Sequence, residues 1–509
     1  MTNLTRNLQV KRNLVTNVIT LGVNVGIGIF YTPYLVSTLG IVAYGILPLA
    51  FLINHYSSVL SGSLTGAFSR FYTIAIQRNE GENASRYLST SFFVMLGIIA
   101  LVFLPLSFVL LQIEKVLNIP ESFIADARLL FIFVFFGFVL SLITNVFNIT
   151  LYAVNRLDLL NLIRIIRASF KFLFVLLFFK NISVGIHYVG LAVLLSESVA
   201  LTVSYVFYLK KTSVVTKLSY QLVDKNVFYS VGAMASFTII HQLGDLGIYR
   251  VDVLLVSQYW STIESGIIAA IEELGKYTII LSTVISSLFG PLILIAYAKE
   301  DEKQVKELSL DRSLSVGVIV AALIGLLSGF GVIVLKLWLG ESYSEYSPWL
   351  TLKLAFIPFY AAAGVFSFAL RAMNKVRFPA FMTVAFGTVN FISLWIVANY
   401  VLGGASAIGI MLIIGTLIAT VQSYFLNGFY FAYFYPGTIK TVLINFFKIG
   451  LVYFATYKLA VYLAGIGSSL SSTEIIIVMI ISSLFSVLIS LAITLNKNQK
   501  RSLLSIFIK

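Results

Sequence analysis

The chain contains no cysteine, only three histidines and few charged residues, and these absences exclude several classes of protein. Without cysteine, neither a disulfide framework nor thiol chemistry is available. Three histidines without a Cys/His cluster argue against a structural zinc site, and no metal or cofactor is expected. Charged residues make up 11% of the chain, against about 25% in a typical soluble domain. The composition therefore argues against a soluble protein.

Long uncharged stretches are abundant instead. Residues 13–69 and 378–439 contain no Asp, Glu, Lys or Arg. Each stretch is too long for one transmembrane helix, which needs about 20 residues, so each must hold two. Apolar runs between charged or Gly/Pro-marked breaks predict about fourteen membrane-spanning helices, at 13–36, 42–68, 88–112, 127–151, 159–180, 187–209, 227–256, 264–297, 313–337, 349–371, 379–401, 405–431, 440–463 and 474–496. The predicted fold class is an all-α polytopic membrane protein.

The basic residues alternate along these helices. If the N-terminus is cytoplasmic, the inner segments carry most of them, and the outer loops hold little beyond Lys115, Lys180 and Lys336. This positive-inside bias predicts a multi-pass plasma (inner) membrane protein with both termini in the cytoplasm. It also accounts for the net charge of +14, so nucleic acid is not an expected partner. The polar, basic N-terminus runs straight into a spanning segment, so no cleavable signal peptide is expected.

The two halves of the chain resemble each other. Residues 145–160 (NVFNITLYAVNRLDLL) recur as 364–379 (GVFSFALRAMNKVRFP), and residues 45–78 match 266–299 at almost the same offset. Such a repeat is typical of transporters built from two lobes around one cavity. The offset spans six helices, an even number, so the lobes are predicted to be parallel and related by an axis along the membrane normal.

The repeat and the charge pattern divide the chain into four parts. The predicted parts are an N-terminal lobe of helices 1–6, a cytoplasmic linker, a C-terminal lobe of helices 7–12, and two added helices with a basic tail, at 1–209, 210–226, 227–435 and 436–509. No loop exceeds about twenty residues, which leaves no room for a soluble catalytic domain. The lobes are expected to rock against each other, and a self-contained pair of lobes can work as a monomer.

Four segments resemble one known family. The segment PYLVSTLGIVAYGILPLA (33–50) resembles the first external turn of polysaccharide-type flippases, and RVDVLLVSQYWSTIESGIIAA (250–270) resembles the matching turn of the second lobe. The segments LYAVNRLDLLNLIRI (151–165) and LRAMNKVRFPAFMTV (370–384) look like the basic cytoplasmic turns of that family. The family is the polysaccharide-transport branch of the multidrug/oligosaccharidyl-lipid/polysaccharide exporter superfamily.

This resemblance implies a flippase rather than an enzyme. Its members move a polyprenyl-diphosphate-linked oligosaccharide, an O-antigen, capsule or exopolysaccharide repeat unit, from the inner to the outer leaflet of the bilayer for polymerisation. A glycan polymerase machinery is then an expected neighbour. The peptidoglycan-precursor flippase of the superfamily has an arginine-containing motif in its first helix, whereas this helix offers only Asn17 and Asn24.

A diphosphate substrate needs cations inside the membrane, because an anion in hydrocarbon is costly. The candidates for the substrate cavity are Lys276, Arg250, His55, Asn24 and Asp245. Several of these have local alternatives. Lys276 can pair with an acid three or four residues earlier on its helix, and a buried neutral histidine is an alternative for His55.

Acidic residues near the same helices could carry a coupling ion or serve as structural partners. The candidates are Asp245, Glu272, Glu273 and Asp252. Asp245 and Asp252 are seven residues apart, which would place them on one helix face. An ion pair between Arg250 and Asp252 that anchors the helix end is the alternative. His241 aligns with Thr20 of the first lobe and is more simply a buried neutral residue.

Basic residues at the cytoplasmic side form a candidate entrance for the substrate. Arg164, Arg167 and Lys171 have the spacing of one helix face, and Arg70 is placed at the end of helix 2. They could hold the diphosphate, or they could anchor the helices at the interface with snorkelling side chains.

Two other functions compete with the flippase. A multidrug-type cation antiporter of the same superfamily would need an acidic cavity, and here the intramembrane charges are mixed or basic. A membrane-embedded glycan polymerase or ligase would need a sizeable external loop. No Gly-x-x-x-x-Gly-Lys-(Ser/Thr) sequence is present, so ATP hydrolysis by a P-loop is excluded.

Overall fold

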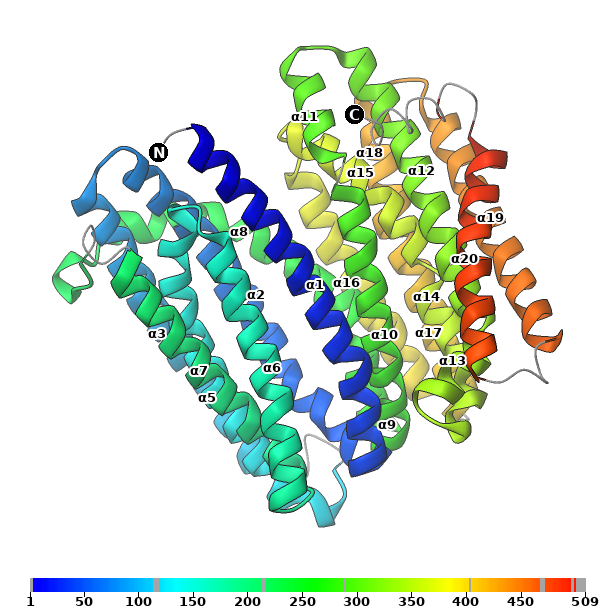
Figure 1. The fold of residues 1–509 in the computed structure, drawn as a ribbon, viewed down its shortest axis with the longest axis horizontal. Helices are drawn as coiled ribbons and strands as arrows, with labels where there is room; N and C mark the ends of the chain where they lie inside the picture. Colours follow the sequence, from blue (N-terminus) through cyan, green and yellow to red (C-terminus); the bar gives the residue numbers. More distant parts are fainter. Residues whose placement is uncertain are drawn as a thin grey trace. The chain divides into compact units, whose positions relative to one another are not determined.

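A computed structural model describes residues 3–112, 119–211, 217–287, 289–401, 404–466, 472–495 and 499. These residues form helices joined by short turns, and none of them lies in a β-strand (Figure 1). The chain divides into two compact units. The N-terminal unit comprises Met1–Leu243 and Val256–Gly266, and the C-terminal unit comprises Gly244–Leu255 and Ile267–Lys509.

The N-terminal unit is built around α5, which packs along α7 and also against α2. Its helices are α1 (Asn3–Leu39), α2 (Ile41–Gln77), α3 (Gly81–Leu111), α5 (Ile124–Ala153), α6 (Leu157–Asn181), α7 (Ile186–Lys211) and most of α8 (Lys225–Tyr249), with 3₁₀ turns at Glu121–Phe123 and Tyr220–Leu222. Helix α6 packs on α7 and α1. Most buried side chains of the unit are apolar, and small hydroxyl residues such as Ser89, Thr144 and Ser204 are buried among them.

The C-terminal unit is built around α12, which is buried over most of its length and packs along α19 and α15. The helices from α9 onward are α9 (Val251–Tyr259), α10 (Thr262–Ser287), α11 (Gly290–Ala298), α12 (Glu302–Gly329), α13 (Gly331–Trp338), α14 (Ser347–Leu354), α15 (Ile357–Ala372), α16 (Arg377–Tyr400), α17 (Gly404–Thr420), the π-helix η4 (Val421–Leu426), α18 (Asn427–Phe434), α19 (Ile439–Ile466) and α20 (Ser472–Thr494), with a 3₁₀ turn at Glu341–Tyr346. Gly325 and Gly329 let α12 approach α19 closely, since a methyl group on either would meet the backbone of α19.

Each of the fourteen predicted spans falls on helix, and the prediction of an all-α polytopic membrane protein is confirmed. Among the described residues, 11 helical segments are long and apolar enough to cross a membrane. The other three predicted spans are those of α2, α6 and α8–α9. Helix α6 carries several basic residues, α8–α9 carries Asp245, Arg250 and Asp252, and in α2 the apolar segment is Ile41–Leu52.

Several predicted spans are interrupted rather than continuous. The segment predicted as one helix at 227–256 breaks at Arg250, between α8 and α9. The later breaks before α11 and α15 coincide with a proline at the start of the second helix. Proline fits there because the first turn of a helix needs no N–H donor from it. Helix α2 runs on to Gln77, so Arg70 does not end it as the sequence predicted.

The internal repeat reappears in the backbone of four turns. Asn79, Asn155, Glu300 and Asn374 are the non-glycine residues with positive φ among the described residues, at 57–58°. In each case the next residue donates its N–H to a carbonyl five residues back, as at Glu80 to Ala75 (2.9 Å), which is the Schellman closure of a helix. Asn155 and Asn374 are partners in the repeat, and Asn79 and Glu300 directly follow its other matched segment.

Glu300 is the least suited of these four residues to its conformation, because asparagine tolerates positive φ better than glutamate does. We expect Glu300→Asn to raise the free energy of unfolding by about 1 kcal/mol. The reverse exchange at the equivalent turn, Asn79→Glu, should lower it by a similar amount. Thermal unfolding of the two detergent-solubilised variants measures both effects, and shifts of the same sign would contradict the account.

Candidate functional site

The C-terminal unit contains a network of four charged side chains from three segments. Lys353 of α14 lies between two carboxylates: its Nζ forms an ion pair with Asp252 of α9 and lies 2.7 Å from Oε1 of Glu272 on α10. The second carboxylate oxygen of Glu272 accepts a hydrogen bond from Nη1 of Arg250 at 3.1 Å. The side chains of Asp252 and Glu272 are each 9% exposed.

This network contains two acids and two bases, and each carboxylate contacts a base. Burying any of these charges alone would be costly, and pairing them removes most of that cost. The expected pair between Arg250 and Asp252 is not what forms, because Arg250 bonds Glu272 and Asp252 bonds Lys353. Asp245 and Asp252 do not lie on one continuous helix as expected, since the helix is interrupted between them.

Asp245 lies close to two aromatic hydroxyls rather than at the network. Its charge acts on Tyr249, one turn along α8, and on Tyr360 of α15. The two tyrosine rings lie edge to face at 6.2 Å, and Phe356 stacks on Tyr249 at 5.4 Å. Asp245 thus acts electrostatically on an aromatic part of the unit.

Lys276 has a local partner. Its Nζ lies 3.2 Å from Oε2 of Glu273, three residues earlier on α10, and the hydroxyl of Tyr277 lies 3.4 Å from the same oxygen. The side chain of Lys276 is 42% exposed, much more than that of Lys353 at 16%. Lys276 is therefore the more accessible of the two lysines, although Glu273 partly neutralises it.

Three of the four basic residues predicted at the entrance lie together on α6 in the N-terminal unit, and the fourth, Arg70, lies on α2. Arg167 forms an ion pair with Glu197 of α7, with Nε and Oε1 at 3.0 Å, while Nζ of Lys171 lies 4.7 Å from the ring centre of Tyr31. Arg164, one turn before Arg167, reaches Asn161 at 3.4 Å. The Arg167 side chain is 31% exposed. Among the described contacts, Glu197 is the acidic residue that pairs with this basic stripe of Arg164, Arg167 and Lys171.

A buried carboxylate lies at the start of α6. Asp158 is 2% exposed and contacts Arg156 (2.9 Å), Arg12 (3.0 Å) and the amide of Gln9 (2.9 Å), while Asn13 accepts its backbone N–H. Burial alone would raise the pKa of Asp158. The hydrogen bonds from Arg156 and Gln9 and the charges of Arg156 and Arg12 outweigh burial and hold this pKa below its usual value. The aspartate thus fastens α1 to α6.

The remaining predicted residues are dispersed along the chain. Asn24 is half-buried on α1, Arg70 is exposed on α2, and His241 is half-buried on α8. His55 belongs to α2, but its side chain lies outside the described part of the structure. Within the described residues, no three His, Cys, Asp or Glu side chains converge as a metal site would require.

Three charged residues of these clusters escaped prediction. Lys353 lies in the predicted span 349–371, and Glu197 is the single acid of the predicted span 187–209. A charged residue inside a span is itself a signal, because it must find a partner. Asp158 gives no such signal, since an acid beside Arg156 at a helix start is typical of a solvated turn.

The chain was compared with known proteins and solved structures. No protein-family profile matches it. It is 27% identical over 392 residues to the uncharacterized membrane protein EpsK of Bacillus subtilis (strain 168), which covers 75% of each chain. It superposes on an inward-facing MATE-family multidrug transporter with a TM-score of 0.69 at 13% identity, covering 82% of this chain and 99% of that one.

A second solved structure is similar over almost the whole chain. The lipid II flippase MurJ, in an inward closed conformation, superposes with a TM-score of 0.69 at 14% identity and covers 94% of this chain and 98% of its own. The chain has the fold of the multidrug/oligosaccharidyl-lipid/polysaccharide exporter superfamily. The fold predicted from the sequence is thereby confirmed, and the two solved structures that share it are those of a multidrug transporter and a flippase.

We expect the stability of the protein to depend on Lys353 much more than on Lys276. Lys353→Met leaves Asp252 and Glu272 buried without their shared base, which should cost about 3–5 kcal/mol of unfolding free energy. Lys276→Met disturbs a more exposed pair and should cost about 1 kcal/mol or less. Adding Glu272→Gln to Lys353→Met should recover part of the loss. Unfolding of the purified variants measures these values, and equal losses at both lysines would refute the comparison.

We also expect a contribution of Asp158 to stability that disappears in acid. Because its pKa is lowered in the folded protein, the carboxylate stabilises the fold above the unfolded-state pKa of about 4, and this stabilisation is lost as the pH falls through the folded value. Asp158→Asn should therefore lower the unfolding temperature at pH 7. The gap between variant and wild type should close as the pH is lowered below about 4, whereas a gap independent of pH would contradict this origin.

Proposed function

We propose that this exporter is a flippase that moves a polyprenyl-diphosphate-linked oligosaccharide from the inner to the outer leaflet by alternating access. The oligosaccharide would be an O-antigen, capsule or exopolysaccharide repeat unit. The proposal draws on the sequence segments that resemble those of polysaccharide-type flippases. It also draws on the fold shared with MurJ, a flippase of lipid II.

The basic stripe of α6 is the observation that carries the proposal. Arg164, Arg167 and Lys171 bring three positive charges onto one helix, and Arg167 pairs with Glu197 of α7. Three positive charges close together next to apolar helices favour an anionic head group such as a diphosphate, and arginine binds phosphate with paired donors. In this proposal Glu197 pairs with Arg167 in the absence of substrate, and the diphosphate takes the place of Glu197 when it binds.

The residues first assigned to the cavity receive secondary roles. Arg250 and Lys276 each contact a glutamate in the C-terminal unit, so less of their charge is available to an anion. Asn24 and His55 would contact the sugars. Asp245, Asp252, Glu272 and Glu273 are the acids that could bind a coupling ion, and of these Asp252 and Glu272 share Lys353.

The cellular setting follows from the charge pattern. We propose a plasma-membrane location with both termini in the cytoplasm, lobes at 1–209 and 227–435, a linker at 210–226, and a terminal part at 436–509 that includes α19 and α20. The exporter would work as a monomer and deliver its substrate to a glycan polymerase on the outer side.

A multidrug antiporter is the second candidate, because the MATE family shares this fold. Such a protein accepts organic cations and needs an acidic site for them. Asp245 and Glu273 are the acids that this candidate would use. The three basic residues on α6 disfavour the antiporter, since an organic cation approaching Arg164 and Lys171 would be repelled.

Translocation by purified protein tests the proposal. In proteoliposomes with a fluorescent polyprenyl-diphosphate oligosaccharide, we expect Arg167→Gln to slow translocation about 10- to 100-fold, the loss of one charge-assisted hydrogen bond to phosphate. Arg167→Lys should restore part of the rate. Lys180→Gln, at the other end of α6, is the matched control and should leave the rate unchanged.

The outcomes separate the two candidates. Equal rates for wild type and Arg167→Gln would remove α6 from the substrate path. A folded wild type that translocates no glycan lipid, but exchanges an organic cation for protons or sodium, would replace the flippase by the antiporter.

A further inference from the structure

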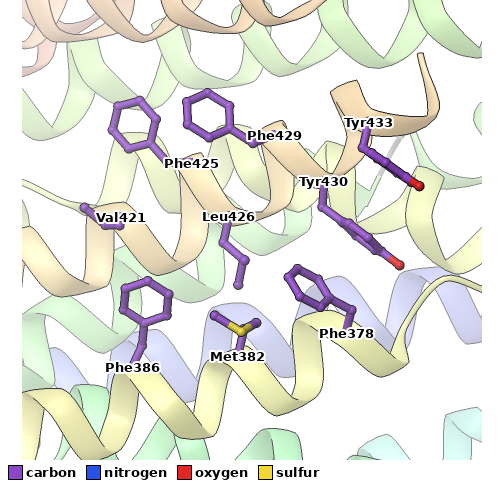
Figure 2. Close-up of a pocket in the computed structure, with 9 residues that line it drawn as sticks. All are labelled: Phe378, Met382, Phe386, Val421, Phe425, Leu426, Phe429, Tyr430 and Tyr433. Carbon is purple, nitrogen blue, oxygen red and sulfur yellow. The ribbon is translucent and has the colours of Figure 1, made fainter. Parts of the chain in front are cut away.

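The C-terminal unit carries an apolar groove between α16 and the continuous segment of η4 and α18. In Figure 2, Leu426 and Tyr430 point toward α16, and Met382 and Phe378 of α16 point toward them. The groove has a volume of about 520 Å³, within the range of small-molecule sites. Six of its nine lining side chains are aromatic, and the other three are Met382, Val421 and Leu426.

The groove has walls of fixed spacing. Behind it, the side-chain amide of Gln422 donates a hydrogen bond to the hydroxyl of Thr383 at 2.8 Å, and both residues are buried. The neighbouring Tyr424 points the other way and donates to the carbonyl of Val442 at 3.0 Å. These bonds hold η4 against α16 on one side and α19 on the other. The groove is therefore part of the packed unit, and it needs no rearrangement to form.

The π-helix shapes one wall of the groove. Val421, Phe425 and Leu426 all belong to η4, where the helix carries one extra residue per turn. Such widened turns are rare and are often found at functional sites. The two walls extend about 12 Å along α16, from Phe378 to Phe386, and about 18 Å along η4 and α18, at a rise of 1.5 Å per residue.

One end of the groove is aromatic and basic. Phe378 and Tyr430 face each other there with ring centres 4.7 Å apart, and Phe434 lies 5.2 Å beyond Tyr430. The Nζ of Lys375 lies 5.1 Å from the ring centre of Phe434. Arg377 directly precedes Phe378 in the chain, and both basic residues are exposed. This end belongs to the turn between α15 and α16, which the charge pattern predicts to be cytoplasmic.

We propose that this groove binds the polyprenyl chain of the lipid-linked substrate, with its phosphates at Lys375 and Arg377. The inference rests on the proposed flippase function and assigns a site for the tail of that substrate. A groove without charged lining residues matches a hydrocarbon chain, and the basic end matches the anionic group attached to it. The substrate would dock here from the inner leaflet before its head group enters the protein.

An isoprenoid chain suits this groove better than a phospholipid acyl chain does. A methyl-branched, unsaturated chain is irregular and stiff, so it can fit closely against a fixed aromatic surface. A straight acyl chain is more mobile and loses more conformational entropy on such a surface. Two basic residues at one end also match two linked phosphates. The ordinary acyl chain is the occupant against which the proposal is tested.

Photo-crosslinking of the full-length exporter in phospholipid nanodiscs tests this site. The probe is a long-chain polyprenyl monophosphate with a diazirine in its chain, and the labelled peptides are mapped by mass spectrometry. We expect labelling to concentrate on α16, η4 and α18. Leu426→Trp and Met382→Trp fill the groove from opposite walls, and each should reduce this labelling at least tenfold. Leu451→Trp, on the exposed face of α19, is the matched control and should not change it.

The outcomes distinguish this site from the function on which it rests. Labelling at the groove in the wild type, displaced by unlabelled polyprenyl phosphate but not by phosphatidylglycerol, supports the proposal even if a tryptophan variant fails to fold. Displacement by phosphatidylglycerol to the same extent overturns it in favour of ordinary lipid. Saturable labelling elsewhere overturns the groove and keeps the flippase. No saturable labelling anywhere overturns the groove and also counts against a polyprenyl substrate.

Discussion

A charged side chain inside a membrane must be matched by an opposite charge, because lipid offers no water to solvate it. Ion pairs that meet this requirement connect helices in both units of the protein. In the C-terminal unit, Lys353 joins the acids of α9 and α10, so that three separate segments are held by one ammonium group. In the N-terminal unit, Arg167 and Glu197 join α6 to α7 in the same way. The pairs that meet this requirement also determine which charges are left for a substrate.

The internal repeat could be detected in the sequence because its turns need particular residues. Asparagine at 155 and 374 adopts the left-handed conformation that ends a helix and returns the chain, and few residues do this without strain. The helices between the turns were predictable for a similar reason, since apolar runs of sufficient length have no stable alternative in lipid. The resemblance to the exporter superfamily was recognised from the order of these segments.

The pairing of the charges could not be predicted from the sequence. Spacing on an ideal helix would place Asp245 and Asp252 on one face, but Arg250 interrupts that helix, and the two residues belong to α8 and α9. Lys353 lies about 80 residues from Glu272, and no local pattern links them. The groove between α16 and α18 was equally hidden, because a π-helix differs from an α-helix by one residue, and hydrophobic periodicity does not resolve such a small change.

The four-charge network of the C-terminal unit has an electrical consequence. With Arg250, Lys353, Asp252 and Glu272 all ionised, the group carries no net charge, although it contains four full charges. A single charge that crosses the membrane potential exchanges about 2.3 kcal/mol per 100 mV. A neutral group changes its depth without such work, so the voltage exerts no net force on these four charges taken together.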